Sequence, residues 1–313
     1  MKIYVAVTAL DAAQKARLND ALSGHDVTYA DELASPDARQ VAASGSEVIF
    51  GNPPAAWLQN APRLKWVQLD SAGVNAYLGL ASAPVVFTNL NSFFGQAVAE
   101  SALAGILAYY RQLPRLLVAQ RERRWIKKQV EPAIGQLHGA NVVILGAGAI
   151  GTKLAALLRP FEGEVKLFAR QSRAAQLHTP TELDAALAVA DIVVNSLPEV
   201  SGTVGILDRA RLGRLRPSSL VVNVGRGSAI DEVALLDALN NERIAGAVLD
   251  VTTVEPLPAD HAFWMHPKVI LTQHTGGRFP GETDAKITRF LANFALFARG
   301  EPLPDPVNLS RGY

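Results

Sequence analysis

One stretch near the middle of the chain constrains the fold most, because it combines a strand pattern, a glycine-rich turn and a helix pattern. Residues 142–145 are apolar and mostly β-branched, and residues 152–158 repeat apolar side chains at helical spacing. Between them lies Gly146-Ala147-Gly148-Ala149-Ile150-Gly151. Gly146 permits a tight turn, Gly148 lets a ligand approach the backbone, and Gly151 lets the helix close onto the strand. This G-x-G-x-x-G turn predicts a dinucleotide site with the phosphates at the start of the helix; a turn without a ligand is the alternative.

The end of the next predicted strand indicates which dinucleotide is bound. Residues 164–169 have a strand pattern, and Arg170 follows 19 positions after Gly151. A carboxylate at this place would bind the ribose 2′-hydroxyl of NAD. The chain instead has Arg170, Ser172 and Arg173, which suit a 2′-phosphate through charge-assisted hydrogen bonds. We therefore predict NADP(H) as the favoured cofactor, with NAD(H) as the second choice and a solvated basic turn as the alternative to either.

Length and composition limit the remaining possibilities. A chain of 313 residues with 49% hydrophobic and 19% charged residues predicts two globular domains. The net charge of +1 gives no reason to expect nucleic acid or an anionic membrane as a partner, and no apolar run is long enough to span a bilayer. The chain has no cysteine, which excludes thiolate nucleophiles and cysteine-bound metals. We expect a cytoplasmic protein without a metal site.

The N-terminal part of the chain predicts a parallel α/β layer. Short apolar runs at 2–7, 47–50, 64–69 and 85–89 alternate with helical stretches. None of them leads into a G-x-G-x-x-G turn, so this module is not expected to hold the nucleotide. Ligands of such sheets meet the loops beyond the carboxyl ends of the strands, which makes loops 51–54 and 71–75 candidates for substrate contact. A role only in turns is the alternative for their prolines and glycines.

The rest of the chain predicts a spine helix and a second α/β layer. Small and apolar residues over 96–111 indicate a long helix between the two modules, and the basic run 121–128 indicates a solvated arm or a subunit contact. Further strands are predicted within the apolar runs 190–198, 220–227, 245–251 and 269–272. Helices are predicted at 232–240 and 282–299.

Three charged residues follow predicted strands, where side chains converge on a ligand. Arg226 lies between two glycines, and its planar guanidinium suits bidentate binding of a carboxylate. A carboxylate paired with histidine fixes the imidazole ring and stabilises its protonated form, so Glu255 with His274 would supply a general acid near neutral pH. Taken singly, each has an ordinary alternative: a surface arginine, a loop carboxylate and a hydrogen-bonded histidine.

These motifs together resemble the D-isomer-specific 2-hydroxyacid dehydrogenase family, from the first strand to the tail. The resemblance rests on the 146–151 turn and on these segments: Asn223-Val224-Gly225-Arg226-Gly227-Ser228 with Asp231-Glu232, Asp250-Val251-Thr252-Thr253-Val254-Glu255-Pro256-Leu257, and Trp264-Met265-His266-Pro267 before Thr272-Gln273-His274-Thr275-Gly276-Gly277. It implies two Rossmann-like or flavodoxin-like parallel-sheet domains. A cofactor domain, residues 95–281, would be inserted into a discontinuous substrate domain of residues 1–94 and 282–313, with catalysis in the cleft between them and a homodimer formed through the cofactor domains.

The resemblance also implies roles for individual residues. Arg226 would bind substrate, Glu255 would pair with His274, and His274 would donate the proton. Ala72, Gly73 and Val74 match the family's substrate-carboxylate loop. Asp250 matches the carboxylate near the nicotinamide carboxamide, and the other expected cofactor contacts are Leu197, Pro198, Val224, Gly225, Arg226, His274 and Gly276, besides Gly146, Gly148, Ala149, Ile150 and Gly151.

The implied reaction is hydride transfer from NAD(P)H to a small 2-oxo acid, similar to glyoxylate or hydroxypyruvate, which gives the D-2-hydroxy acid. Two departures from many relatives are Arg170, as in the NADP-using glyoxylate and hydroxypyruvate reductases, and Gln273 in place of proline. Two alternatives stay open. One is a nucleotide-sensing, corepressor-like binding protein on the same fold, and the other is an NAD-dependent dehydrogenase of a larger 2-hydroxy acid.

Overall fold

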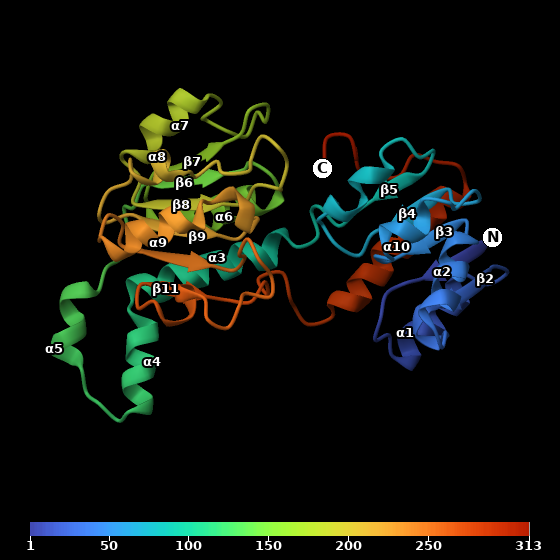
Figure 1. Cartoon of the computed structure of the whole chain (residues 1–313), viewed down its shortest axis with the longest axis horizontal. Coiled ribbons are helices and arrows are strands. Elements are labelled where there is room, and N and C mark those ends of the chain that lie inside the picture. Colours follow the sequence, from blue (N-terminus) through green and yellow to red (C-terminus); the bar gives the residue numbers. More distant parts are fainter. Residues whose placement is uncertain (313) are drawn as a thin grey trace. The chain divides into compact units, whose positions relative to one another are not determined.

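The computed structural model describes residues 1–312 and divides the chain into two compact units (Figure 1). Unit 1 is Met1–Phe93 together with the C-terminal segment that starts at Phe279, and unit 2 is Phe94–Arg278. The sequence placed the borders at 94/95 and 281/282. The chain thus leaves unit 1, completes unit 2, and then returns to unit 1.

Unit 1 is built on a five-stranded parallel sheet with the order β2-β1-β3-β4-β5. This is the flavodoxin-like order, in which the chain changes direction across the sheet between β1 and β3. The strands are β1 (Lys2–Val5), β2 (Asp26–Tyr29), β3 (Val48–Phe50), β4 (Trp66–Gln68) and β5 (Val86–Thr88), and the helices are α1 (Ala12–Ala21), α2 (Pro36–Ser44) and α10 (Glu282–Ala298), with 3-10 turns η1 (Ala30–Glu32), η2 (Ala55–Leu58) and η3 (Asn75–Leu80).

Alternate side chains of the unit 1 strands enter two separate cores. On one face of the sheet, Ile3, Val5 and Phe50 pack against α1 and α10. On the other face, Tyr4, Ile49 and Val67 pack against α2, η2 and η3. The C-terminal helix is anchored by aromatic stacking, since the Phe290 ring centroid lies 4.4 Å from that of Phe50. The last helix of the chain is therefore part of the N-terminal module.

Unit 2 is built on a six-stranded parallel sheet with the order β11-β10-β9-β8-β6-β7. The change of direction lies between β6 and β8. The strands are β6 (Val142–Leu145), β7 (Val165–Phe168), β8 (Ile192–Asn195), β9 (Leu220–Asn223), β10 (Gly246–Leu249) and β11 (Val269–Leu271); the helices are α3 (Gly95–Tyr110), α4 (Leu113–Arg121), α5 (Lys127–Val130), α6 (Ala149–Leu158), α7 (Pro180–Leu187), α8 (Arg209–Leu212) and α9 (Glu232–Asn240), with 3-10 turns η4 (Glu131–Ala133), η5 (Arg159–Phe161), η6 (Gly227–Ala229) and η7 (Ala262–Met265).

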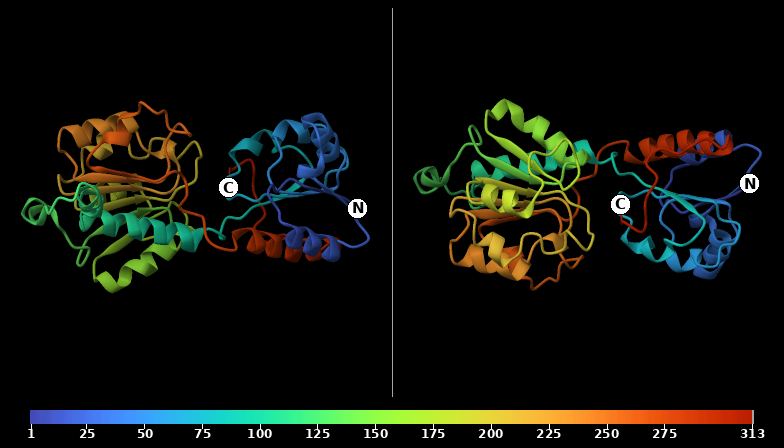
Figure 2. Two further views of the ribbon diagram at one scale, coloured as in Figure 1. Left: turned by 90° about the horizontal axis from the view of Figure 1, so that it is seen from below. Right: turned by 90° about the horizontal axis from the view of Figure 1, so that it is seen from above.

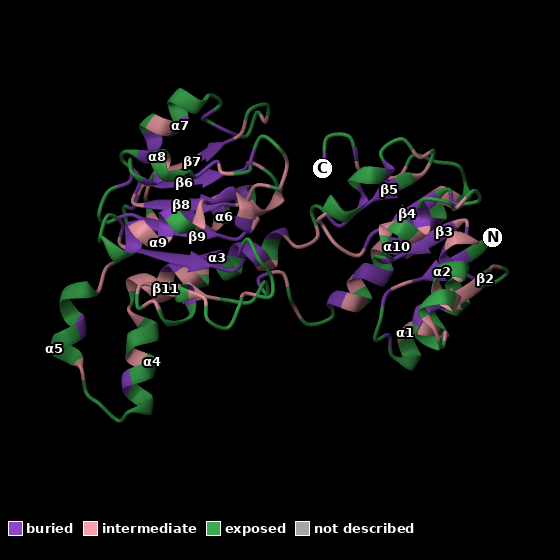
Figure 3. Ribbon diagram, viewed as in Figure 1, coloured by how far each residue is buried: buried purple, intermediate pink, exposed green. Residues whose placement is uncertain are grey.

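Helices cover both faces of this sheet, as the two views in Figure 2 show. Val142 and Ile144 of β6 pack toward α3 and α6, whereas Val143 and Leu145 pack toward α7, α8 and α9. Because both faces are covered, the central strands β6, β8 and β9 are fully buried (Figure 3), and they are apolar apart from the asparagine that ends β8 and β9. The predicted fold class, two parallel-sheet α/β domains, is confirmed.

Several elements were not predicted from the sequence. The short strand β2 has alternating polar residues and escaped notice, as did α2 and α7, although each of those helices has a side-chain N-cap at Ser35 or Thr179 followed by proline. Apart from β6, the observed strands are also shorter than the runs that predicted them. The extra residues lie in the turns before and after these strands.

An arm of two helices, α4 and α5, extends from the rest of unit 2 (Figure 1). It includes the basic run 121–128, whose side chains are exposed except for that of Ile126. The arm also exposes large apolar side chains, with Leu117 at 56%, Val118 at 52% and Trp125 at 89%. Among residues 1–312, no helix combines the length and the apolarity that crossing a bilayer requires.

Candidate active site

The predicted catalytic and cofactor-contacting residues all lie at one edge of the unit 2 sheet. They follow the carboxyl ends of β6, β7, β8, β9, β10 and β11, which point the same way because the strands are parallel. The predicted substrate loop at Ala72, Gly73 and Val74 follows β4 of unit 1. Within unit 2, the parallel sheet thus brings together segments more than 100 residues apart in the sequence, such as those of Gly146 and His274.

The glycine turn between β6 and α6 has the geometry of a ligand cradle. Gly146 has φ of +112°, a backbone conformation that is strained for any residue with a side chain. A Cβ at this position would lie 2.6 Å from Ser196 Oγ. A Cβ on Gly151 would overlap the carbonyl oxygen of Gly146. A Cβ on Gly148 would meet nothing within 4 Å, so the space beside its backbone is open. The turn therefore leaves room for phosphates where the N–H groups of α6 begin, and it fits the dinucleotide that the sequence predicts.

Two buried asparagines, which the sequence analysis did not identify, fix the loops that follow β8 and β9. Asn195 at the end of β8 donates from Nδ2 to Asn223 Oδ1 over 2.9 Å, and both side chains are buried. Asn195 Oδ1 accepts from the N–H of Leu197, and Asn223 Oδ1 accepts from that of Gly225. Asparagine at the end of an apolar strand is the signal that would have located this pair.

Arg170 follows β7, as predicted, and is exposed. Its guanidinium lies against Gly202, since a Cβ there would clash with the terminal nitrogens of Arg170. Ser172 is half-buried and Arg173 is exposed on the same turn. A basic surface is thereby placed at the end of the strand next to β6, the position that adjoins the ribose in nucleotide-binding sheets of this kind.

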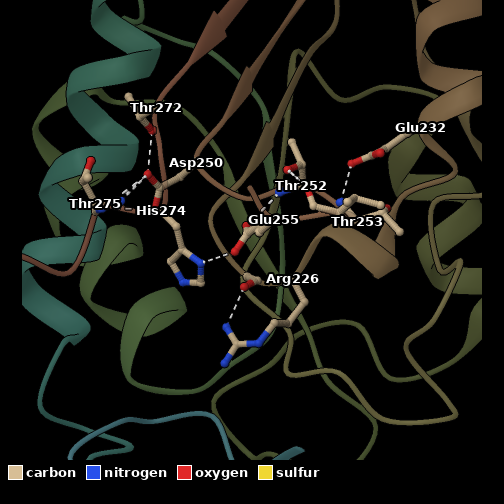
Figure 4. Close-up of polar contacts among 12 residues, drawn as sticks. Arg226, Glu232, Asp250, Thr252, Thr253, Glu255, Thr272, His274 and Thr275 are labelled. Carbon is tan, nitrogen blue, oxygen red and sulfur yellow. Dashed lines mark hydrogen bonds and ion pairs between the residues drawn. The ribbon is translucent and has the colours of Figure 1, made fainter. Parts of the chain in front are cut away.

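His274 and Glu255 form a hydrogen-bonded pair (Figure 4). The Nδ1 atom of His274 lies 2.7 Å from Glu255 Oε2, and both side chains are partly exposed. The other carboxylate oxygen, Oε1, accepts from the N–H of Thr252 over 3.0 Å, so Glu255 is itself held in place. With Nδ1 taken by the carboxylate, Nε2 is the atom left to exchange a proton with a ligand.

The backbone around His274 is shaped by Asp250. His274 has φ of +53°, a left-handed conformation that is uncommon for residues other than glycine, and its N–H donates to the Asp250 carbonyl over 2.7 Å. The buried Asp250 carboxylate accepts from Thr272 Oγ1 at 2.6 Å and from the N–H groups of Thr275 and Gly276, both at 3.1 Å. Asp250 therefore holds the loop that presents His274. The contact with the nicotinamide carboxamide stays a prediction.

Arg226 is placed beside this pair by close backbone packing (Figure 4). A Cβ on Gly227 would overlap the backbone of Thr252 and Thr253, so only glycine lets the two segments approach. The guanidinium of Arg226 is half-buried and donates from Nη1 to the carbonyl of Gly225 over 2.8 Å. One donor thus supports the turn, and the planar group retains further N–H donors for a ligand.

The loop after β4 in unit 1 is anchored through its carbonyl oxygens. Those of Ser71, Ala72 and Gly73 accept from the N–H of Leu90, from Asn89 Nδ2 and from Ser71 Oγ, at 3.0, 2.8 and 2.9 Å. In a trans peptide the C=O and the following N–H point in opposite directions. The N–H groups of Ala72, Gly73 and Val74 therefore point away from these anchors, which is the orientation needed to bind an anion.

The unit 2 residues combine three chemical capacities at one sheet edge: a phosphate cradle, an oriented imidazole and a guanidinium. An imidazole held by a carboxylate is suited to general acid catalysis, and an adjacent guanidinium stabilises negative charge on oxygen. Within residues 1–312 there is no cluster of three His, Cys, Asp or Glu side chains placed to hold a metal ion.

Comparison with known proteins agrees with this geometry. Residues 103–276 match the family described as D-isomer specific 2-hydroxyacid dehydrogenase, NAD binding domain. The glyoxylate/hydroxypyruvate reductase A of Photorhabdus laumondii is 31% identical over 274 residues, which cover 83% of this chain and 85% of the relative.

Solved structures that are similar over the whole chain include two with a bound nicotinamide cofactor. An NADPH-dependent glyoxylate/hydroxypyruvate reductase from Sinorhizobium meliloti, solved with NADP and sulfate, is 26% identical with a TM-score of 0.83. A D-isomer specific 2-hydroxyacid dehydrogenase from Xanthobacter autotrophicus, solved with NADPH and MES, is 28% identical with a TM-score of 0.81. In both comparisons, 99% of each chain is covered.

The fold, the glycine turn and these matches define a nicotinamide-dependent oxidoreductase of the dehydrogenase class. The chain belongs to the D-isomer-specific 2-hydroxyacid dehydrogenase family. The resemblance seen in the sequence is thereby confirmed, and so is the prediction of an NAD(P)-dependent enzyme.

Gly148 and Gly151, two glycines of the 146–151 turn with very different surroundings, give a direct test of its geometry. We expect Gly151→Ala to lower the free energy of unfolding by about 1–3 kcal/mol, because its Cβ overlaps a backbone oxygen. Gly148→Ala meets no atom and should change it by less than about 0.5 kcal/mol. Chemical denaturation of both variants measures the difference, and equal losses of stability would contradict this account of the turn.

Proposed function

We propose that this protein is an NADPH-dependent reductase of small 2-oxo acids such as glyoxylate and hydroxypyruvate, and that it forms the D-2-hydroxy acid. The observation that carries the proposal is the 2.7 Å contact between His274 Nδ1 and Glu255 Oε2, next to the segment that bears Arg226. The relatives named as glyoxylate/hydroxypyruvate reductases support the choice of substrate.

In this proposal the protein binds and orients the 2-oxo acid, stabilises the charge that develops on its keto oxygen, and protonates that oxygen. Arg226 binds the carboxylate and the keto oxygen, which orients C2 and stabilises the negative charge that develops on that oxygen. His274 Nε2 delivers a proton to the same oxygen, and Glu255 stabilises the charged imidazole and keeps its orientation. When bound, the reduced nicotinamide supplies the hydride that C2 accepts.

The loop at Ala72, Gly73 and Val74 binds the substrate carboxylate with its N–H groups. This assignment is supported by the anchored carbonyls of residues 71–73, which orient the N–H groups before a ligand arrives. A carboxylate bound by backbone N–H groups and an arginine needs no cationic side chain from the loop itself.

The cofactor lies on the 146–151 turn, and the 2′-phosphate of NADPH is bound by Arg170, Ser172 and Arg173. The absence of a carboxylate at position 170 and the exposure of both arginines support this preference. Leu197, Pro198, Val224, Gly225, Asp250 and Gly276 are the further cofactor contacts that we propose.

The working form is a homodimer made through unit 2. Support comes from the arm of α4 and α5, which exposes Leu113 (46%) as well as Leu117, Val118 and Trp125. Large apolar side chains grouped on an extended arm are costly in water and are typical of subunit contacts.

A panel of 2-oxo acids assayed with both nucleotides tests the substrate assignment. We expect NADPH oxidation with glyoxylate and hydroxypyruvate at kcat/KM of about 10⁴ M⁻¹s⁻¹ or more, and weaker use of acids with bulky side chains. Tight nucleotide binding without turnover of any acid would favour a nucleotide-sensing protein. Preference for a bulky acid would refute the small-substrate assignment.

Replacement of the proton donor tests the catalytic assignment. We expect His274→Ala to lower kcat by about 10²–10⁴-fold while the Kd for NADPH changes by less than about twofold, because proton delivery is lost and the cofactor turn is intact. His138→Ala, which removes an exposed histidine of the same unit, is the matched control. Full turnover in His274→Ala would remove this residue from the mechanism.

A charge reversal tests the cofactor preference. We expect Arg170→Asp to lower the ratio of kcat/KM with NADPH to kcat/KM with NADH by about 100-fold, since a carboxylate repels the 2′-phosphate and accepts from the ribose hydroxyl. Arg159→Asp makes the same change in net charge at the far end of α6 and should leave the ratio unaltered. A wild-type protein that prefers NADH would show that residues 170–173 do not select NADPH.

A further inference from the structure

A buried ion pair in unit 1 has no part in the proposed chemistry. Lys286 Nζ lies 2.7 Å from Glu282 Oε1, and both side chains are at most 10% exposed. The same Nζ lies 3.8 Å from Asp70 Oδ2, whose side chain is 22% exposed. The Lys286 ammonium group therefore lies between Glu282, the first residue of α10, and Asp70, which directly precedes the loop at 71–74.

The buried face of α10 is polar at just the points that approach the carboxyl end of β4. Asn293, two turns further along the helix, donates from Nδ2 to Gln68 Oε1 over 2.7 Å. Gln68 Oε1 also accepts from Thr88 Oγ1 of β5 over 2.9 Å, and these three residues are almost fully buried. Asn293, Gln68 and Thr88 thus form a second buried polar contact between α10 and the end of β4, two residues before Asp70.

A contribution to folding stability does not by itself account for the buried charges of Lys286 and Glu282. Removing a lysine and a carboxylate from water costs several kcal/mol per ion, and well-packed apolar residues of similar size are often equally or more stabilising. The rest of the α10 interface is of that apolar kind, with Ile287, Phe290 and Phe294 in the core. A buried pair at this one place is better explained by the orientation that it imposes on a neighbour.

The neighbour is Asp70, which directly precedes the proposed substrate loop. Its N–H donates to Asn52 Oδ1 over 3.2 Å, and the carbonyls of the following three residues are bonded as described above. Lys286 contacts the Asp70 side chain, with 3.8 Å between Nζ and Oδ2. Together these contacts hold both the backbone and the side chain at position 70.

We infer that Lys286 is a positioning residue for substrate binding: held by Glu282, it fixes Asp70 and thereby the N–H groups of Ala72, Gly73 and Val74 that receive the substrate carboxylate. This inference rests on the proposed function for its assignment of the loop. Lys286 takes no part in proton or hydride transfer, so its loss affects KM for the acid and leaves kcat in place.

The double variant Glu282→Gln/Lys286→Met is the main test, because it removes both charges of the buried pair together and leaves neither of these two residues as a buried ion without the other. We expect KM for glyoxylate to rise about tenfold, with kcat and the Kd for NADPH changed by less than about twofold. We also expect amide hydrogen exchange of a peptide covering residues 69–75 to become about tenfold faster without substrate, because the loop is less constrained. Lys286→Met alone should show the same direction if it folds.

The control is Arg289→Met on the same helix, where Arg289 pairs with Asp305 at 3.0 Å. It should alter neither KM nor exchange at 69–75. Unchanged KM and unchanged exchange in the double variant would overturn the inference, and so would a fall in kcat with KM unaltered. If the wild-type protein turned over no 2-oxo acid, the proposed function would fail, whereas the exchange measurement would still decide whether Lys286 orders the loop.

Discussion

Parallel strand pairing is the constraint on which the site in unit 2 depends. Because all six strands run in one direction, the loops that carry the glycine turn, Arg170, Arg226, Asp250 and His274 all emerge at one edge of the sheet. Helices on both faces bury the strands and make that edge rigid, so the side chains on it keep their relative places. A site gathered from distant parts of the sequence is then a consequence of the fold.

Buried polar groups turn this edge into a defined geometry. The Asn195–Asn223 pair ties together the loops after β8 and β9, and Asp250 binds the loop that carries His274 in a left-handed conformation. A backbone held in that region costs about 1–3 kcal/mol, which the hydrogen bonds to Asp250 offset. The direction of the imidazole is thereby set twice, once through the backbone and once through Glu255.

Unit 1 uses related means with different residues. The loop after β4 is bound through its carbonyls to Asn89, Leu90 and its own Ser71, and α10 brings a buried ion pair next to Asp70, which precedes these residues. In both units, an apolar sheet supplies rigidity, and a few buried polar side chains at its carboxyl edge determine where the loop atoms point. Both sheets also place a glycine with φ of +112° at the change of strand direction, Gly51 in one and Gly146 in the other.

The sequence by itself determined the elements whose signal is local. Apolar runs with strand or helix periodicity located β6 and α6, α9 at residues 232–240, and the long helices α3 and α10, and the motifs containing Arg226, Glu255 and His274 indicated the family. Short or polar elements such as β2 gave too weak a local pattern. Tertiary structure alone decided the role of Asp250 in holding the His274 loop, the Asn195–Asn223 pair, and the burial of Lys286 with Glu282. The physical reason is that periodicity depends on neighbours in the chain, whereas these hydrogen bonds and ion pairs depend on which strands and helices pack together, and the order of strands in a sheet cannot be read from any single segment.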